Sequence, residues 1–178
     1  IAAEVAVTRP ARLRRLILAD AVGIKIGGRE DRDIAHFFNT HPDELTRRAW
    51  HDPDTIPAGC YGLGWQARID DTMPDADMIA LARNWDSLCL YGWTPHMYNP
   101  RLKAWLRRID VPTLVLWGEQ DRILDVSCAD AFAELLPHAE VERQRRVGHL
   151  PMIEVPGVTS RRLRGFWARH AAAPLACA

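Results

Sequence analysis

A run of apolar residues at 111–118 predicts a buried strand that ends at a glycine. The sequence there is Val-Pro-Thr-Leu-Val-Leu-Trp-Gly, in which apolar residues are continuous rather than alternating with polar ones. Continuity of this kind is typical of a parallel strand that is covered on both faces. A second run lies at 13–22, and Gly23, Gly27 and Gly28 follow and end it. The two runs favour an α/β protein.

Helical segments alternate with these strands. Residues 127–136 and 159–170 have helical spacing, and a third strand is expected at 139–147. This third strand is more polar, so we expect it nearer the edge of the sheet. Alternating strands and helices imply a parallel sheet with right-handed crossovers, and ligands of such sheets bind beyond the carboxyl ends of the strands. The residues that follow each strand are therefore the place to look for functional side chains.

Residues 30–95 differ in character from the sequence on either side. They contain no convincing strand, and prolines separate short segments that have helical spacing. These segments lie at 33–38, 42–50 and 76–90. We therefore predict a mostly helical insertion in the α/β protein.

The insertion divides the chain into three parts. The α/β core is predicted to comprise residues 1–29, which open with a helix, and residues 96–170, which open with a helix at 101–108. Residues 30–95 form the insertion between them. The tail at 171–178 is small and apolar, and we expect it to be disordered.

The charge and composition of the chain argue against several classes of binding partner. The chain has 23 basic and 23 acidic side chains, and this zero net charge argues against general nucleic-acid binding. No apolar run approaches the roughly 20 residues that a transmembrane helix needs, so we expect no membrane partner. The four cysteines fit neither a zinc site nor a dense disulfide framework, and the histidines show no metal spacing. We expect a cytoplasmic protein that binds a small molecule without metal or cofactor.

An acid and an imidazole stand at equivalent places after two neighbouring strands. Asp121 follows the strand at 111–118, and His149 follows the strand at 139–147. They are 28 residues apart, which is one strand–helix unit, so the carboxylate can reach the Nδ1 side of the imidazole. A buried carboxylate there fixes the tautomer of a histidine and stabilises its imidazolium form during proton transfer.

Other interpretations of these residues stay open. Asp121 can instead be a simple cap for the helix that follows it. Asp125 is a nearby rival for the role of acid, and Asp20, at the end of the strand at 13–22, is a weaker one.

The motifs around this pair resemble those of the α/β-hydrolase family, from residue 1 to about residue 168. The resemblance implies that Asp121 is the acid and His149 the general base of a Ser-Asp-His triad. It also implies that residues 30–95 are the helical cap of that family. The motifs that carry it are residues 113–122, Gly148-His149, Asn99-Pro100-Arg101-Leu102 and Ile109-Asp110-Val111-Pro112.

The chain departs from the family at the nucleophile, which sits in a G-x-S-x-G turn that precedes the acid and the base. No such motif occurs among the 178 residues, since Ser87, Ser127 and Ser160 lack the flanking glycines. Cys60 and Asp20 are weaker substitutes. Cys60 has no strand before it, and no helical pattern follows Asp20 directly.

The opening residues suggest where the nucleophile lies. The chain starts with good helix formers and has neither an initiating Met nor a capping residue, so it enters partway through a helix. In the family the nucleophile turn immediately precedes a helix in this place. We therefore expect the serine just upstream of Ile1, and we expect the 178-residue fragment alone to be inactive.

Four tryptophans fall in the insertion, at positions 50, 65, 85 and 93. Each is most simply part of the packing of the insertion, but together they suggest an apolar or aromatic substrate. Trp93, Ile123 and Leu150 are the expected substrate contacts.

The predicted function is cleavage of an ester-like or activated carbon–carbon bond in a small, fairly apolar substrate. One alternative is a haloalkane dehalogenase or epoxide hydrolase with an aspartate nucleophile. Another is a non-catalytic, hydrolase-like ligand-binding protein. The sequence upstream of Ile1 discriminates among them.

Overall fold

The structure is a computed structural model that describes residues 1–9, 11–55, 73–92 and 97–171. Three expectations fall outside these residues. They are Cys60 as a substitute nucleophile, Trp93 as a substrate contact and the disorder of residues 172–178.

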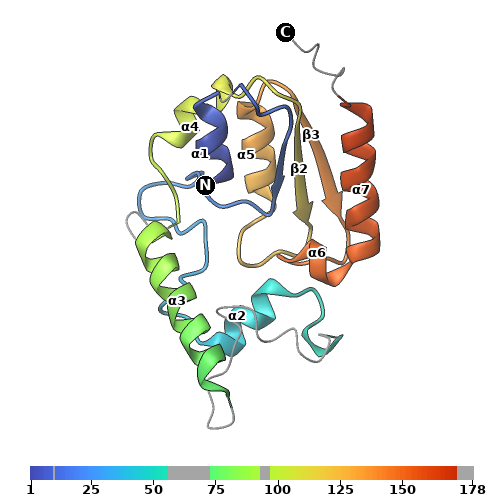
Figure 1. Ribbon diagram of the computed structural model, residues 1–178. Helices are drawn as coiled ribbons and strands as arrows, with labels where there is room; N and C mark the ends of the chain where they lie inside the picture. The colour runs from blue at the N-terminus through green and yellow to red at the C-terminus, as the bar shows by residue number, and fades with distance from the viewer. Residues whose placement is uncertain (10, 56–72, 93–96, 172–178) are drawn as a thin grey trace.

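Three parallel strands form one sheet in the order β1-β2-β3 (Figure 1). The strands are β1 (Leu16–Ala19), β2 (Thr113–Gly118) and β3 (Ala139–Gln144). Every residue of β2 is buried, because β2 is the central strand and both of its faces are covered. The more polar β3 lies at an edge, as its sequence predicts. Within the described residues the three predicted strands are confirmed, although β1 and β3 are shorter than expected.

Helices cover both faces of the sheet (Figure 1). On one face lie α1 (Ala2–Val7), α5 (Ser127–Leu135) and α4 (Leu102–Trp105), which continues into the 3-10 helix η4 (Leu106–Arg108). The other face is covered by α7 (Pro156–Arg169). These two layers around a parallel sheet confirm the predicted α/β class.

Alternate side chains of β2 supply the two halves of the core. Val115 and Trp117 belong to the larger buried cluster on the α5 side, where the Trp117 ring lies 6.4 Å from the ring of Phe132. Leu116 points to the opposite face and packs with Phe166 of α7. The period of two along a strand thus explains why a continuous apolar sequence is needed here.

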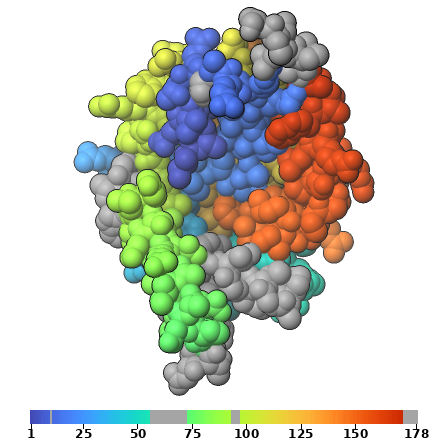
Figure 2. Space-filling model, in the orientation of Figure 1, coloured from blue at the N-terminus to red at the C-terminus, as the bar shows by residue number. Residues whose placement is uncertain are grey.

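Two helices of the predicted insertion lie beyond the carboxyl end of the sheet (Figure 1). They are α2 (Pro42–Ala49), which continues to the short 3-10 helix η1 (Pro53–Thr55), and α3 (Asp75–Gly92). In Figure 2, α3 forms a lobe at the lower end of the molecule. The α2 residues Leu45 and Ala49 belong to the same buried cluster as the sheet. The limits of the core and the cap stay predictions.

The expected helix at 33–38 is wrong. Ile34 instead forms an antiparallel bridge with Leu124, and the N–H of Ala35 donates to the carbonyl of Ile123. Pairing with the segment after β2 satisfies backbone groups that a helix would have satisfied internally. A short helix that was not predicted, α6 (Pro151–Glu154), precedes α7.

Within the described residues, no helix combines the length and the hydropathy that crossing a bilayer requires.

Candidate active site

The loop after β3 carries His149, and the carboxylate of Glu154 fixes its backbone. Glu154 Oε1 accepts from the Gly148 N–H at 2.8 Å and from the Leu150 N–H at 3.4 Å. Glu154 lies at the end of α6, so this short helix turns its side chain back onto the loop. This role of Glu154 was not predictable from the sequence, because a hydrogen bond from a helix to the loop before it leaves no periodic signal.

Asp121 stands in the turn after β2 and uses both of its carboxylate oxygens. Oδ1 accepts from the N–H groups of Ile123 and Leu124 at 2.8 and 3.0 Å. Oδ2 lies 2.8 Å from His149 Nδ1. The interpretation of Asp121 as a cap for the following helix is wrong, because Oδ1 binds N–H groups of the turn that precedes α5, and α5 begins only at Ser127. The other oxygen meets the imidazole.

The Asp121–His149 pair is sheltered from water. The Asp121 side chain is 0% exposed and that of His149 is 16% exposed. Because Asp121 Oδ2 faces Nδ1, the imidazole carries a proton on Nδ1 when the carboxyl is ionised, which leaves Nε2 as the basic nitrogen. The pair therefore has the geometry of a general base and the acid that orients it.

A second histidine–aspartate pair has a similar contact distance but lies elsewhere in the fold and is exposed to solvent. His138 Nε2 lies 3.0 Å from Asp110 Oδ1, and these residues are also 28 apart in sequence. Their side chains are 56% and 64% exposed, and they lie near the amino ends of the strands. That pair is a solvated surface contact, whereas Asp121 and His149 meet at the carboxyl end of the sheet.

Asp125 does not compete for the role of acid. Its Oδ1 accepts from the Ser127 N–H at 2.8 Å at the start of α5. Hydrogen bonds from the side chain and the backbone of Ser127 lower the pKa of the Asp125 carboxyl. Ser127 is thereby engaged by Asp125.

Asp20 lies beside the pair, at the end of β1. Its Oδ1 accepts from the Gly118 N–H at 2.9 Å, and its backbone φ of 41° is left-handed. Burial raises the pKa of Asp20 from 3.8 to about 9, although the bond from Gly118 opposes this shift. The charge and the carboxyl hydrogen bond of Asp121 add to the increase. This raised pKa favours the neutral form of the Asp20 carboxyl at neutral pH.

Asp20, Asp121 and His149 form the one cluster with metal-ligand spacing among the described residues. One ligand atom from each lies within 4.8 Å of the others. A metal needs free ligand atoms, but the Gly118 N–H donates to Asp20 Oδ1, and three contacts already occupy the Asp121 oxygens. The cluster therefore fits a hydrogen-bonded network better than a metal.

The carboxyl end of α2 holds both loops. The Ala49 carbonyl accepts from the His149 N–H at 2.6 Å. The Arg122 side chain, next to the acid, donates to the carbonyl of Trp50 at 3.0 Å and to that of Arg47. Arg122 is a positioning residue that sequence reasoning missed, because its partners lie more than 70 residues away.

Two glycines allow these loops to stack. A Cβ on Gly118 would lie 1.9 Å from the carbonyl oxygen of Gly148, and a Cβ on Gly148 would lie 2.2 Å from that of Ala49. Real Cβ atoms essentially never come so close, so both positions require glycine. The acid loop, which follows β2 and holds Asp121, the His loop, which follows β3 and holds His149, and α2 are thus packed backbone against backbone.

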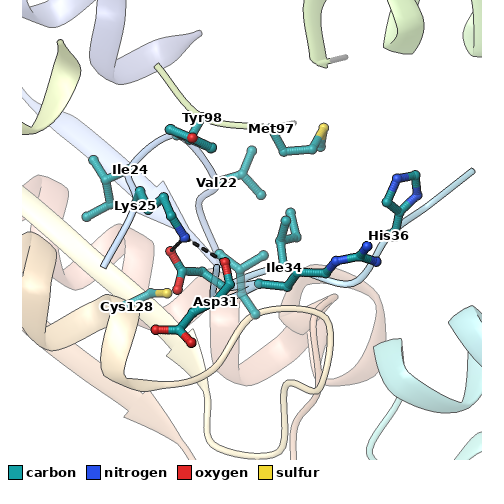
Figure 3. A pocket seen from close by; sticks show the side chains of 13 residues that line it. Val22, Ile24, Lys25, Asp31, Ile34, His36, Met97, Tyr98 and Cys128 are labelled. Carbon is teal, nitrogen blue, oxygen red and sulfur yellow. Dashed lines mark hydrogen bonds and ion pairs between the residues drawn. The ribbon is translucent and has the colours of Figure 1, made fainter. Parts of the chain in front are cut away.

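A cavity of about 280 Å³ adjoins the acid loop (Figure 3). Its walls come from the loop after β1, the bridge segment at 31–36, the residues before α4, and α5. The side chains of Val22, Ile24, Ile34, Met97 and Tyr98 make most of the surface apolar (Figure 3).

One cation on the wall of this cavity is already compensated. Lys25 Nζ donates to the Asp31 carbonyl at 2.7 Å and lies 3.6 Å from Asp33 Oδ2. It also lies over the ring of Tyr98, 5.9 Å from its centroid (Figure 3). Lys25 therefore adds no unpaired charge to this mainly apolar cavity.

The other candidate residues are dispersed. Ile123 is 2% exposed, while Leu150 is partly buried and packs against the core, so both substrate contacts stay predictions. Ser87 is exposed on α3, where its hydroxyl donates to the Arg83 carbonyl. The thiol of Cys128 faces the cavity wall, but burial raises its pKa to about 12.

A parallel sheet that carries an acid–imidazole pair at its carboxyl edge has the architecture of an α/β hydrolase. A sequence model of the alpha/beta hydrolase fold matches residues 34–156, which is more than half of the chain. The chain belongs to this family.

Proteins that are similar to this chain in sequence include lipases. Monoacylglycerol lipase ABHD6 of Bos taurus is 41% identical over 61 residues, which are 34% of this chain and 18% of that lipase. Lipase 3 of Moraxella sp. (strain TA144) is 31% identical over 61 residues, which are 34% of this chain and 19% of that lipase. The similarity thus covers about a fifth of the length of each.

Solved structures share the fold over most of the chain. A membrane phospholipase A, described as a bacterial virulence factor, has a TM-score of 0.63 and 22% identity over 97% of this chain and 55% of its own. The meta-cleavage product hydrolase CumD from Pseudomonas fluorescens IP01 has a TM-score of 0.68 and 17% identity over 94% and 60%. These likenesses show the fold alone.

Proposed function

We propose that this chain supplies the general base and the acid of an ester hydrolase. The observation that carries the proposal is the 2.8 Å contact between Asp121 Oδ2 and His149 Nδ1, with the Asp121 side chain fully buried. The sequence similarity to lipases supports an ester substrate over an activated carbon–carbon bond, because likeness to the meta-cleavage hydrolase rests on fold alone.

His149 Nε2 would accept the proton of a serine hydroxyl as that oxygen attacks the ester carbonyl. Asp121 would hold the imidazole and stabilise its positive charge, and His149 would then return the proton to the departing alcohol. The serine is proposed to lie outside these 178 residues, since they contain no G-x-S-x-G turn. The raised pKa of Asp20, which favours its neutral form, argues against an aspartate nucleophile at that position.

The apolar cavity supports a fairly apolar substrate. Its volume of about 280 Å³ is in the range that holds a small organic group, and its Lys25 is paired. We propose that it accommodates the acyl or alcohol part of an ester such as a monoacylglycerol.

The test is the rate of ester hydrolysis by the protein as its gene encodes it. With p-nitrophenyl butyrate and a monoacylglycerol as substrates, His149→Ala should lower kcat by about a thousandfold or more, and Asp121→Asn by at least about a hundredfold.

The matched controls come from the exposed pair. His138→Ala and Asp110→Asn remove the same side-chain types from a contact of similar length, and neither should change kcat by more than about twofold. Equal losses in both pairs, or a wild-type protein that hydrolyses neither ester, would refute the proposal.

A further inference from the structure

Asp20 is a buried acid that the proposed proton transfers do not use. It is 5% exposed, and its Oδ2 has neither an N–H nor an O–H partner among the described residues. A buried polar atom left in this state is unfavourable unless a neighbour satisfies it. The neighbour here is the carboxyl of Asp121.

Two carboxyl groups can satisfy each other only if they share a proton. Two buried negative charges at this separation repel strongly, whereas one carboxylic acid can donate its O–H to one carboxylate. Asp121 must be the carboxylate, because its oxygens accept two backbone N–H groups and face His149 Nδ1. The proton therefore resides on Asp20.

We propose that Asp20 is a positioning residue that donates a hydrogen bond to the carboxylate of Asp121 and keeps that carboxylate aimed at His149. The proposal deepens the proposed function, because it concerns the same acid–base pair. The backbone supports it as well, since the Gly118 N–H holds Asp20 Oδ1 and so fixes the carboxyl beside the pair, with one ligand atom each of Asp20, Asp121 and His149 within 4.8 Å of one another.

The groups around Asp20 favour its neutral form. Asp121 and Glu154 are the charged side chains that raise its pKa, and the Gly118 N–H is the group that lowers it. His149, the third member of the cluster, meets Asp121 through Nδ1. With its pKa at about 9, Asp20 donates at neutral pH and loses its proton only in alkaline solution.

The left-handed backbone at Asp20 determines which variants are informative. Asn and Gly adopt a φ of 41° readily, but Ala does not, so Asp20→Ala would mix strain with loss of the carboxyl. Asp20→Asn keeps a neutral hydrogen-bond donor in place. Asp20→Gly removes the donor without straining the chain. Asp125→Asn is the control, because Asp125 is an exposed neighbour with a lowered pKa.

The first measurement needs no turnover. Isotope-edited infrared spectra of protein labelled at the aspartate carboxyl carbon should contain a protonated-carboxyl band at pH 7. We expect Asp20→Asn to abolish this band and Asp125→Asn to leave it. In the wild type the band should disappear around pH 9, and the NMR signal of the His149 Nδ1 proton should shift over the same range. Absence of the band at pH 7 would overturn the proposal.

The second measurement separates positioning from folding. In variants that unfold at the same urea concentration, kcat of Asp20→Gly at pH 7 should fall about tenfold below that of Asp20→Asn with KM little changed, the loss of about one buried hydrogen bond. The alkaline decrease in kcat near pH 9 should be present in the wild type and absent in Asp20→Asn. Equal kcat values and identical pH profiles would overturn the proposal. If the wild type hydrolyses no ester, the function fails, and the infrared result still decides the role of Asp20.

Discussion

A single protonated acid at the site has a consequence for the stability of the protein. The pKa of Asp20 is about 9 in the folded state and 3.8 in its ordinary environment. Between these values the unfolded chain has lost a proton that the folded chain keeps. The contribution of Asp20 to the free energy of unfolding therefore decreases as the pH rises from about 4 to 9, by at most about 1.4 kcal/mol per pH unit.

Asp20→Asn removes this dependence, because an amide does not titrate. We expect the variant to gain stability relative to the wild type as the pH rises from 4 to 8, by at least about 1 kcal/mol in total. Urea denaturation at several pH values measures it, with Asp125→Asn as the control. Parallel curves for the wild type and Asp20→Asn would show that Asp20 is ionised in the folded protein.

The sequence predicted the contact between Asp121 and His149 but not the residues that surround it. Asp121 and His149 were predictable because each follows a strand, and parallel strands bring their carboxyl ends together. The roles of Arg122 and Glu154 were not predictable. Arg122 donates to a backbone carbonyl at the end of α2, and Glu154 accepts from a backbone N–H of the His loop. Long-range contacts of this kind appear only once the elements are packed.

At the level of elements, α2 controls the geometry of both loops. The Arg122 guanidinium binds the carbonyl of Trp50, which immediately follows α2, and so attaches the acid loop to this helix. Arg122→Met keeps the length of the side chain and removes these hydrogen bonds. We expect kcat to fall by about tenfold or more while KM changes less, since misplacement of the acid affects the transition state.

Steady-state ester hydrolysis checks the effect of Arg122→Met. Arg145→Met serves as the control, because the Arg145 side chain is 88% exposed and lies 3.9 Å from Glu119. An unchanged kcat in Arg122→Met would mean that α2 does not position the acid loop.

Helices and strands were predicted correctly where a helix forms its backbone hydrogen bonds internally, as α2 does, or where a strand is buried on both faces, as β2 is. The helix α2 was expected at 42–50 and is found at Pro42–Ala49, with acids in its first turn and arginines in its last. The expected helix at 33–38 failed because its amides pair with Ile123 and Leu124, far away in sequence. Helical spacing in a segment of six residues is too weak to outweigh such pairing.

A backbone contact also joins α2 to the His loop. Gly148→Ala would place a methyl group 2.2 Å from the Ala49 carbonyl oxygen, and neither backbone can move without displacing His149 or α2. We expect a loss of about 2 kcal/mol or more in the free energy of unfolding. Gly157→Ala is the control, because no atom lies within 4 Å of the position of its Cβ. Urea denaturation of both variants measures this loss. Similar unfolding midpoints for the two variants would contradict the close packing of Gly148 against Ala49.

At the scale of the whole molecule, the described part of the sheet has an open edge. Within the described residues β1 pairs only with β2, so its outer edge presents unsatisfied backbone groups. Apolar side chains are also exposed at nearby α1, where Val5 is 53% accessible and Ile1, the residue before the helix, is 77% accessible. An unpaired strand edge next to exposed apolar groups favours association between chains.

We therefore expect the 178 residues, expressed alone, to aggregate or to form a loosely packed state that binds a hydrophobic dye. We also expect no ester hydrolysis above buffer, because the chain contains no G-x-S-x-G turn. Light scattering, dye fluorescence and the ester assay test this, with the protein as its gene encodes it measured in parallel. A monodisperse monomer that unfolds cooperatively would contradict the expected association. If such a monomer also lost measurable turnover on His149→Ala, the nucleophile would lie within these residues, with Cys60 and Asp20 the first positions to replace.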